Sequence, residues 1–126
     1  MIWQSKFPGQ PYLVAEIGVN HEGSRTRADT LIKQAAEAGA DAVKFQAYKA
    51  TRLTVANSPT YFWQTGDAAP TQRQFFQRYD MLEPDDYLEL AEVAAEEGVH
   101  FLCTPFDEDA VAWLFPLVEG YKIASG

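Results

Sequence analysis

The sequence alternates short apolar runs with longer amphipathic stretches, and this order constrains the fold more than any other feature. Four apolar runs have the length and residue content of buried strands, at 12–17, 41–48, 99–105 and 121–125. Three stretches between them have helical periodicity and end at a glycine, at 24–39, 83–98 and 107–120. Strands that alternate with helices at this spacing predict a parallel α/β sheet with right-handed crossovers.

The number of elements distinguishes between two α/β architectures. Four strands and three helices in 126 residues amount to about half of a (β/α)8 barrel, which takes about 250 residues. A doubly wound open sheet is the alternative, and it would place a glycine-rich phosphate loop after the first strand. That loop reads GVNHEG here, residues 18–23, and lacks both the G-x-G-x-x-G and the P-loop spacing. We therefore expect the N-terminal half of a TIM barrel, with residues 1–126 forming part of one barrel domain that is truncated after the fourth strand.

Composition argues against several classes of protein. The formal net charge of −8 argues against a nucleic-acid-binding surface, which needs clustered Lys and Arg. No apolar run approaches the roughly 18 residues of a membrane span, and the N-terminus lacks the pattern of a secretory signal. Cys103 is the only cysteine and cannot form an internal disulfide. These features predict a cytoplasmic protein that binds neither nucleic acid nor membrane.

The segment 49–83 departs from the alternation, because it is far longer than the few residues that usually join a strand to its helix. Its aromatic residues are Tyr61, Phe62, Trp63, Phe75, Phe76 and Tyr79. Residues 71–82 have the pattern of a short helix. The segment is expected at the carboxyl ends of the strands, either as a hydrophobic cap or subunit contact, or as a lid or substrate wall, and both roles can hold together.

The second predicted strand carries polar side chains on one face only. Alternation places Lys44 and Gln46 on one face, and Val43, Phe45 and Ala47 on the other. A buried ion must be paired or solvated, since isolated burial costs several kcal/mol. The face that carries Lys44 and Gln46 is therefore expected to meet other polar groups.

The other predicted strands supply such groups, mostly toward their carboxyl ends. The first carries Glu16, the third ends near Thr104, and the fourth carries Lys122 and Ser125. Strands that converge in a barrel would bring these groups together, and two lysines on neighbouring strands repel unless an anion lies between them. The pattern predicts a site for a small anionic substrate. The alternative is a buried Glu16–Lys44 ion pair in which the two side chains neutralise each other and bind no ligand.

Two other features have a structural and a chemical interpretation. His21 and Glu22 are possible metal ligands, but no further ligand follows at a spacing typical of zinc sites, so a turn histidine with a local hydrogen bond is favoured. Cys103 has no general base nearby in the sequence, and we expect a small buried residue rather than a nucleophile. No metal ligand is predicted within the chain.

Four ordered blocks of the sequence resemble one known family. They read AEIGVNHEGS, AGADAVKFQAYKA, FLCTPFDEDAV and YKIASG, and lie between Pro11 and Gly126. The blocks are similar to the N-terminal half of the sialic acid synthase family, which includes N-acetylneuraminate synthase and its legionaminate, pseudaminate and spore-coat polysaccharide relatives. The resemblance implies a TIM barrel followed by a small antifreeze-like domain beyond Gly126, and a homodimer.

The resemblance also implies a reaction. Phosphoenolpyruvate would join the open-chain aldehyde of an N-acetylmannosamine-type sugar, water would attack, and phosphate would leave, giving a nine-carbon 2-keto acid. Carried over by motif, Lys44 of VKFQ and Lys122 of YKIASG would bind phosphoenolpyruvate, and Thr104 of CTPF and Ser125 of IASG would hydrogen-bond to it. Two ammonium groups suit a substrate that carries both a phosphate and a carboxylate.

By the same resemblance, Glu16 would be the catalytic residue, orienting the sugar or taking part in proton transfer, and Gln46 would contact the sugar or neighbouring substrate atoms. A divalent metal, Mn²⁺ or Mg²⁺, would polarise the aldehyde, with its ligands outside this chain. Residues 1–126 alone are therefore expected to be inactive. Two alternatives stay open: another phosphoenolpyruvate-dependent barrel enzyme acting on a different aldose, and a noncatalytic half-barrel that binds sugars or assembles with a partner.

Overall fold

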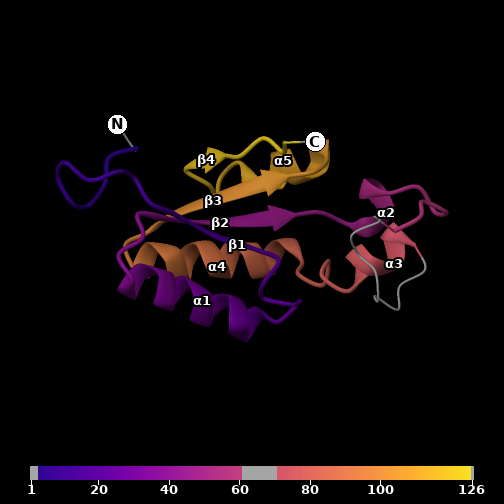
Figure 1. Cartoon of the computed structure of the whole chain (residues 1–126), viewed down its shortest axis with the longest axis horizontal. Helices are drawn as coiled ribbons and strands as arrows, with labels where there is room; N and C mark the ends of the chain where they lie inside the picture. The colour runs from indigo at the N-terminus through magenta and orange to yellow at the C-terminus, as the bar shows by residue number, and fades with distance from the viewer. Residues whose placement is uncertain (1–2, 61–70, 126) are drawn as a thin grey trace.

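The computed structural model describes residues 3–60 and 71–125. Within these ranges the strands are β1 (Val14–Gly18), β2 (Ala42–Ala47), β3 (His100–Pro105) and β4 (Gly120–Tyr121). The helices are α1 (Arg25–Glu37), α2 (Ala50–Leu53), α3 (Gln72–Gln77), α4 (Pro84–Glu96) and α5 (Glu108–Leu114). The strands form one parallel sheet in the order β1-β2-β3-β4, which confirms the predicted α/β architecture (Figure 1).

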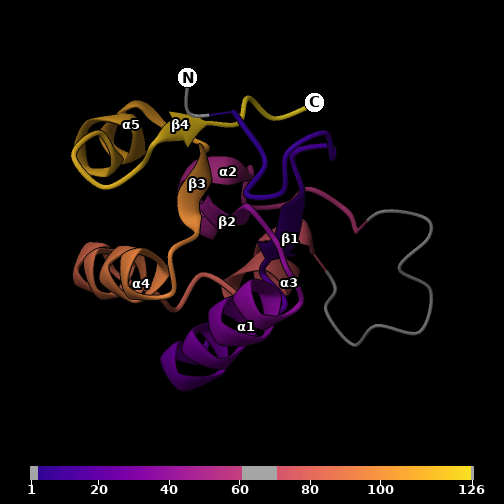
Figure 2. The ribbon, with the colours of Figure 1, turned by 90° about the vertical axis from the view of Figure 1, so that its left-hand side faces the viewer.

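The helices are divided between the side and the end of the sheet. Figure 2 shows α1, α4 and α5 around one side of the curved sheet, in the position of the outer helices of a barrel. In Figure 1, α2 and α3 lie beyond the carboxyl ends of the strands. Among the described residues, no helix has the length and apolar character needed to cross a membrane.

Helix α1 begins and ends where the sequence predicts, because its ends satisfy the backbone locally. Ser24 is the N-cap, and its hydroxyl accepts a hydrogen bond from the Arg27 N–H at 3.2 Å. Gly39 follows the helix with φ of 91°, a left-handed conformation that favours glycine. Between these ends Ala28 and Ile32 are fully buried, so the predicted apolar stripe faces the core.

The core fills the space between the helices and one face of the sheet. Its buried side chains come from β1, β2, β3, α1, α4 and α5 and include Ile17, Val43, Phe45, Phe101, Cys103, Ile32, Leu90 and Leu114. The rings of Phe45 and Phe101 pack across β2 and β3 with centroids 5.4 Å apart. Because Phe45 faces this core, its neighbours Lys44 and Gln46 lie on the opposite face of β2, as alternation predicts.

The fourth strand is shorter than predicted. The prediction of a strand over 121–125 is wrong, because β4 comprises only Gly120–Tyr121. The Lys122 N–H still donates to the Cys103 carbonyl oxygen at 3.0 Å, after which the chain leaves the ladder. Among the described residues β4 pairs with β3 alone, so no second ladder extends it. Lys122 and Ser125 therefore follow the strand rather than lie within it.

The described part of segment 49–83 contains two short helices. Helix α3 confirms the helix predicted within 71–82, whereas α2 is a single turn, too short to show a helical repeat in the sequence. Two hydrogen bonds fix α2 and the residue before it: Asp80 accepts from the Ala50 N–H at 2.8 Å, and the Lys49 ammonium donates to the Asp80 carbonyl at 2.9 Å. Tyr61, Phe62 and Trp63, predicted as part of the aromatic loop, lie outside the described residues.

A buried carboxylate ties the N-terminal segment to the start of β2. Asp41 accepts hydrogen bonds from the Leu13 N–H at 2.8 Å and from the Lys6 N–H at 2.5 Å. These two bonds lower the pKa of Asp41, because they favour the ionised carboxylate. The ionised side chain therefore stabilises the folded chain at neutral pH.

We expect Asp41→Asn to lower the thermal denaturation midpoint of the full-length protein at pH 7, because a carboxamide offers one acceptor oxygen where the carboxylate offers two. Folding lowers the pKa of Asp41 below the value of about 3.9 of an unfolded aspartate. The stabilisation is therefore complete above that value and is lost as the pH falls through the lower, folded pKa. The difference in midpoint between parent and variant should narrow below about pH 4.

Glu37→Gln is the matched control, since it makes the same change of charge at an exposed position near the end of α1. It should leave the midpoint almost unchanged across the same pH range. A deficit in Asp41→Asn that stays constant with pH would contradict the role assigned to the ionised carboxylate.

Candidate functional site

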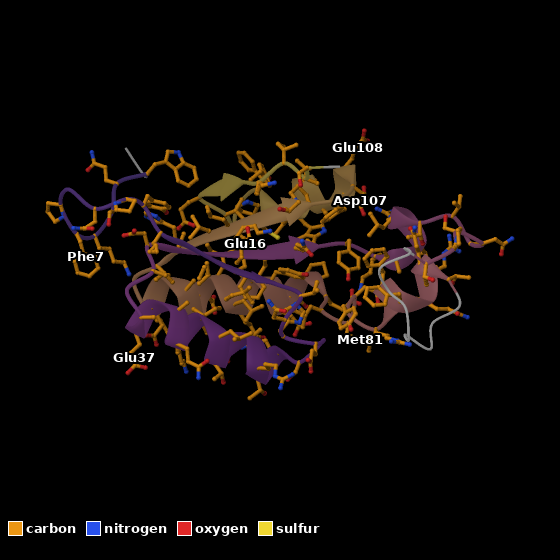
Figure 3. All side chains as sticks on the ribbon, in the orientation of Figure 1. Phe7, Glu16, Glu37, Met81, Asp107 and Glu108 are labelled. Atoms are coloured by element: carbon orange, nitrogen blue, oxygen red, sulfur yellow. The ribbon has the colours of Figure 1, made fainter. Side chains whose placement is uncertain are left out.

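Lys44 is a lysine buried in the middle of the sheet. It lies on β2, is 4% exposed, and its Nζ lies 2.9 Å from Oε2 of Glu16, its register partner on β1. A buried ammonium requires such a partner. The Glu16 side chain is itself 64% exposed, so the pair is open to solvent on the carboxylate side. In Figure 3, Glu16 is labelled within the layer of strands, and Glu37 at the end of α1 below it.

The next polar pair lies across β2 and β3. Gln46 is partly buried and is in register with Thr104, which is 2% exposed. The Tyr87 hydroxyl on α4 donates to the Gln46 carbonyl oxygen at 2.7 Å and holds this end of β2 against the helix layer. The strands thus place a carboxamide and a hydroxyl next to the Glu16–Lys44 pair.

Lys122 and Ser125 complete the polar face from the chain that follows β4. Both are exposed, and the Lys122 ammonium donates to the Ile123 carbonyl oxygen at 2.6 Å. Since β3 lies between β2 and β4, Lys44 and Lys122 are not on neighbouring strands, and that part of the sequence prediction is wrong. In the part of the chain that the structure describes, Lys122 has no carboxylate within ion-pair distance.

These side chains line one cavity of about 380 Å³, within the size range of small-molecule sites. We call it the lysine cavity, and its lining residues are Glu16, Lys44, Gln46, Thr104, Phe106, Lys122, Ala124 and Ser125. All six residues that the sequence singles out lie in it. Two lysines and a single glutamate line the lysine cavity, so it is locally cationic in a chain of net charge −8.

Two residues that line the lysine cavity were not predicted from the sequence. Phe106 and Ala124 carry no polar group, so a search for convergent polar side chains does not find them. Phe106 directly follows Pro105 at the end of β3, and this position at a strand's carboxyl end is the available signal.

His21 has the structural role that the sequence favours. It is 1% exposed, and its Nδ1 accepts a hydrogen bond from the Gly23 N–H at 3.0 Å within the turn. Burial lowers the pKa of His21 and keeps the ring neutral at pH 7. Glu22 pairs with Arg27 rather than with the histidine. The turn interpretation is confirmed.

Cys103 is a core residue rather than a nucleophile, as predicted. It is fully buried on the face of β3 that packs against the helices, away from the lysine cavity. Burial raises the pKa of its thiol to about 12, so the thiolate needed for nucleophilic attack is scarce at neutral pH.

The arrangement of the strands and of the lysine cavity agrees with a family match. Residues 31–126 match the family model described as "NeuB family". The chain belongs to the NeuB family. This confirms the resemblance to the sialic acid synthase family on which the sequence interpretation relies.

Several relatives of this NeuB family chain are named as synthases of legionaminic acid or of N-acetylneuraminate 9-phosphate. It is 39% identical over 118 residues to the N,N'-diacetyllegionaminic acid synthase of Legionella pneumophila, covering 91% of this chain and 33% of that protein. It is 32% identical over 120 residues to the human N-acetylneuraminate-9-phosphate synthase, covering 91% of this chain and 32% of that protein. The chain thus spans about a third of the length of these relatives.

Solved structures give the same assignment for the fold. An N-acetylneuraminic acid synthetase from Leptospira borgpetersenii, in complex with citrate, aligns with a TM-score of 0.70 at 27% identity, covering 97% of this chain and 41% of that one. The spore coat polysaccharide biosynthesis protein of Bacillus subtilis aligns with a TM-score of 0.66 at 32% identity, covering 96% of this chain and 31% of that one. The four strands and their helices are therefore the N-terminal part of this barrel fold.

We expect Lys44→Met to change the free energy of unfolding of the full-length protein by less than about 1 kcal/mol, because the carboxylate of Glu16 remains hydrated when its partner is removed. Glu16→Gln should be the more destabilising change, since it leaves the buried Lys44 ammonium without its carboxylate. Urea denaturation of both variants measures the difference. A loss of about 3 kcal/mol or more in Lys44→Met would mean that the ion pair serves the fold rather than a ligand.

Proposed function

We propose that the protein condenses phosphoenolpyruvate with an N-acetylmannosamine-type sugar and releases phosphate, giving a nine-carbon 2-keto acid. The observation that carries the proposal is the lysine cavity, which is lined by two lysines and one glutamate. The printed names of the relatives as legionaminic, N-acetylneuraminate-9-phosphate and pseudaminic acid synthases support the same reaction class.

The lysine cavity suits a small molecule with two anionic groups. Phosphoenolpyruvate carries a phosphate and a carboxylate, and charge-assisted hydrogen bonds to Lys44 and Lys122 would offset both. The hydroxyls of Thr104 and Ser125 would donate the further hydrogen bonds that fix its orientation. Lys44 is preorganised by burial on β2, so it loses little side-chain freedom when the anion binds.

The reaction requires orientation and proton transfer. The methylene carbon of phosphoenolpyruvate attacks the aldehyde carbon of the open-chain sugar, forming the new C–C bond while the aldehyde oxygen takes up a proton. Water then adds to the carbon that bears the phosphate and loses a proton, and phosphate leaves with the C–O bond electrons as the 2-keto group forms. Glu16 lies at the open side of the lysine cavity, where its carboxylate would orient the sugar hydroxyls or accept the proton of the attacking water.

A divalent metal would supply Lewis-acid polarisation of the aldehyde in such a reaction. Within residues 3–60 and 71–125, no group of three or more His, Cys, Asp or Glu is placed to hold a metal ion. The described residues do not fit this ion, so none of the steps above is assigned to it. The metal requirement, with ligands outside this chain, stays a prediction, as do the homodimer and the cytoplasmic location.

We expect Lys122→Ala and Lys44→Ala each to raise the KM for phosphoenolpyruvate about 10- to 100-fold, because a hydrogen bond to a charged group contributes about 1.5–3 kcal/mol. Phosphate release by the full-length protein with N-acetylmannosamine and phosphoenolpyruvate measures the effect. Lys33→Ala is the control, because it removes an equal charge from the exposed face of α1.

An unchanged KM for phosphoenolpyruvate in both variants would reject the role of the two lysines. If the unsubstituted protein binds phosphoenolpyruvate and the sugar but releases no phosphate, a noncatalytic sugar-binding protein becomes the better description.

A further inference from the structure

Tyr87 is a buried residue of the helix layer whose hydroxyl reaches the strand that carries the polar face. It lies on α4, is 5% exposed, and donates to the Gln46 carbonyl oxygen at 2.7 Å. The side chain of Gln46 lines the lysine cavity. One hydrogen bond therefore connects a helix that packs against the core to a residue of the candidate site.

The direction of the Gln46 carbonyl follows from the geometry of β2. Backbone groups of successive residues in a strand point alternately to its two neighbouring strands. The Ala47 carbonyl oxygen accepts from the Phe106 N–H, directly after β3, at 3.1 Å. The carbonyl of Gln46 therefore points the other way, toward β1.

Strand β1 ends before it can supply a donor to this carbonyl. The last register pair of β1 and β2 joins Gly18 to Phe45. A continued β1 would next offer the Asn20 N–H, but that group donates to the Ile17 carbonyl oxygen at 2.9 Å and closes a turn. The tyrosine hydroxyl takes the place of the missing strand, and it satisfies a backbone acceptor that would otherwise lack a partner from the sheet.

The donor is itself held in place. The ring of Tyr87 packs against the ring of Trp113 on α5, with centroids 5.1 Å apart and planes at 53°. Burial raises the pKa of Tyr87, so the phenol keeps the proton that it donates at neutral pH. The hydrogen bond is therefore fixed at its helix end by α4 and α5 together.

We propose that Tyr87 is a positioning residue, which orients the Gln46 side chain toward the sugar in the lysine cavity. The bonded carbonyl belongs to the planar peptide unit that follows Gln46, so holding it fixes the ψ angle of Gln46 and the direction of its side chain. This inference rests on the proposed condensation, because that reaction would bring the sugar into contact with Gln46.

Lys44 does not depend on this hydrogen bond. It is in register with Glu16 on β1 and with Leu102 on β3, so strands on both sides hold its backbone. Loss of the tyrosine hydroxyl should therefore affect the sugar more than the phosphoenolpyruvate that Lys44 would bind.

The test compares Tyr87→Phe with Tyr121→Phe in the full-length protein. The Tyr121 hydroxyl donates to the Val111 carbonyl oxygen at 2.7 Å, so each change removes one hydroxyl that binds a backbone carbonyl. We expect Tyr87→Phe to lower kcat/KM for N-acetylmannosamine about tenfold, because the sugar is then poorly oriented. The KM for phosphoenolpyruvate should stay almost unchanged, and Tyr121→Phe should change neither value.

A double-mutant cycle with Gln46→Ala separates positioning from a general loss of stability. If Tyr87 acts through the Gln46 side chain, Tyr87→Phe should add almost no further loss of kcat/KM once that side chain is removed. An equal loss in the presence and absence of the Gln46 side chain would overturn the proposal. An unchanged kcat/KM for the sugar in Tyr87→Phe alone would also overturn it.

A crystal structure of full-length Tyr87→Phe gives a readout that needs no turnover. We expect the Gln46 side chain to be displaced or to occupy several conformations, with Lys44 unmoved. If the unsubstituted protein releases no phosphate, the proposed condensation fails, and a displaced Gln46 with unmoved Lys44 would still support the positioning role. A Gln46 side chain that keeps its place in the variant would reject the positioning role, whether or not the protein releases phosphate.

Discussion

The burial of one ammonium group organises this part of the protein. Lys44 lies in the middle of β2 with 4% of its surface exposed, on the face that does not pack against helices. Its charge has to be matched there, and the register of β1 supplies Glu16 at 2.9 Å. That carboxylate lies mostly in solvent, so the ion pair costs less desolvation than a fully buried pair would. The result is a fixed cation at the wall of an open cavity, a geometry that suits an anionic ligand.

The two faces of the sheet have different roles: one packs into the hydrophobic core, and the other carries the polar side chains of the candidate site. One face carries Val43, Phe45 and Cys103 into the core beneath the helices, and the other carries Lys44 and Gln46. The lysine cavity lies toward the carboxyl ends of the strands, where loops add residues without disturbing the core.

Much of the difference between the two faces of the sheet could be predicted from residue periodicity in the sequence. The features that could not be predicted have physical causes. Alternation along β2 correctly places Lys44, and the spacing of Ala28 and Ile32 correctly predicts the buried side of α1. The single turn of α2 has no repeat to detect. The length of β4 depends on its pairing partners, which lie outside its own sequence, and Phe106 has no polar group to mark it as part of a site. The roles of the lining residues in catalysis stay predictions.

The sequence by itself determined the alternation of strands and helices, the face of each strand that carries polar groups, and the family. These properties depend on neighbours along the chain, through periodicity, capping and motif. Only the tertiary structure decided that Lys44 and Lys122 line the same cavity although β3 separates their strands, and that Phe106 and Ala124 line it with them. Distances between groups far apart in the chain depend on how the sheet curves and where the loops pack, and a linear pattern carries no measure of either.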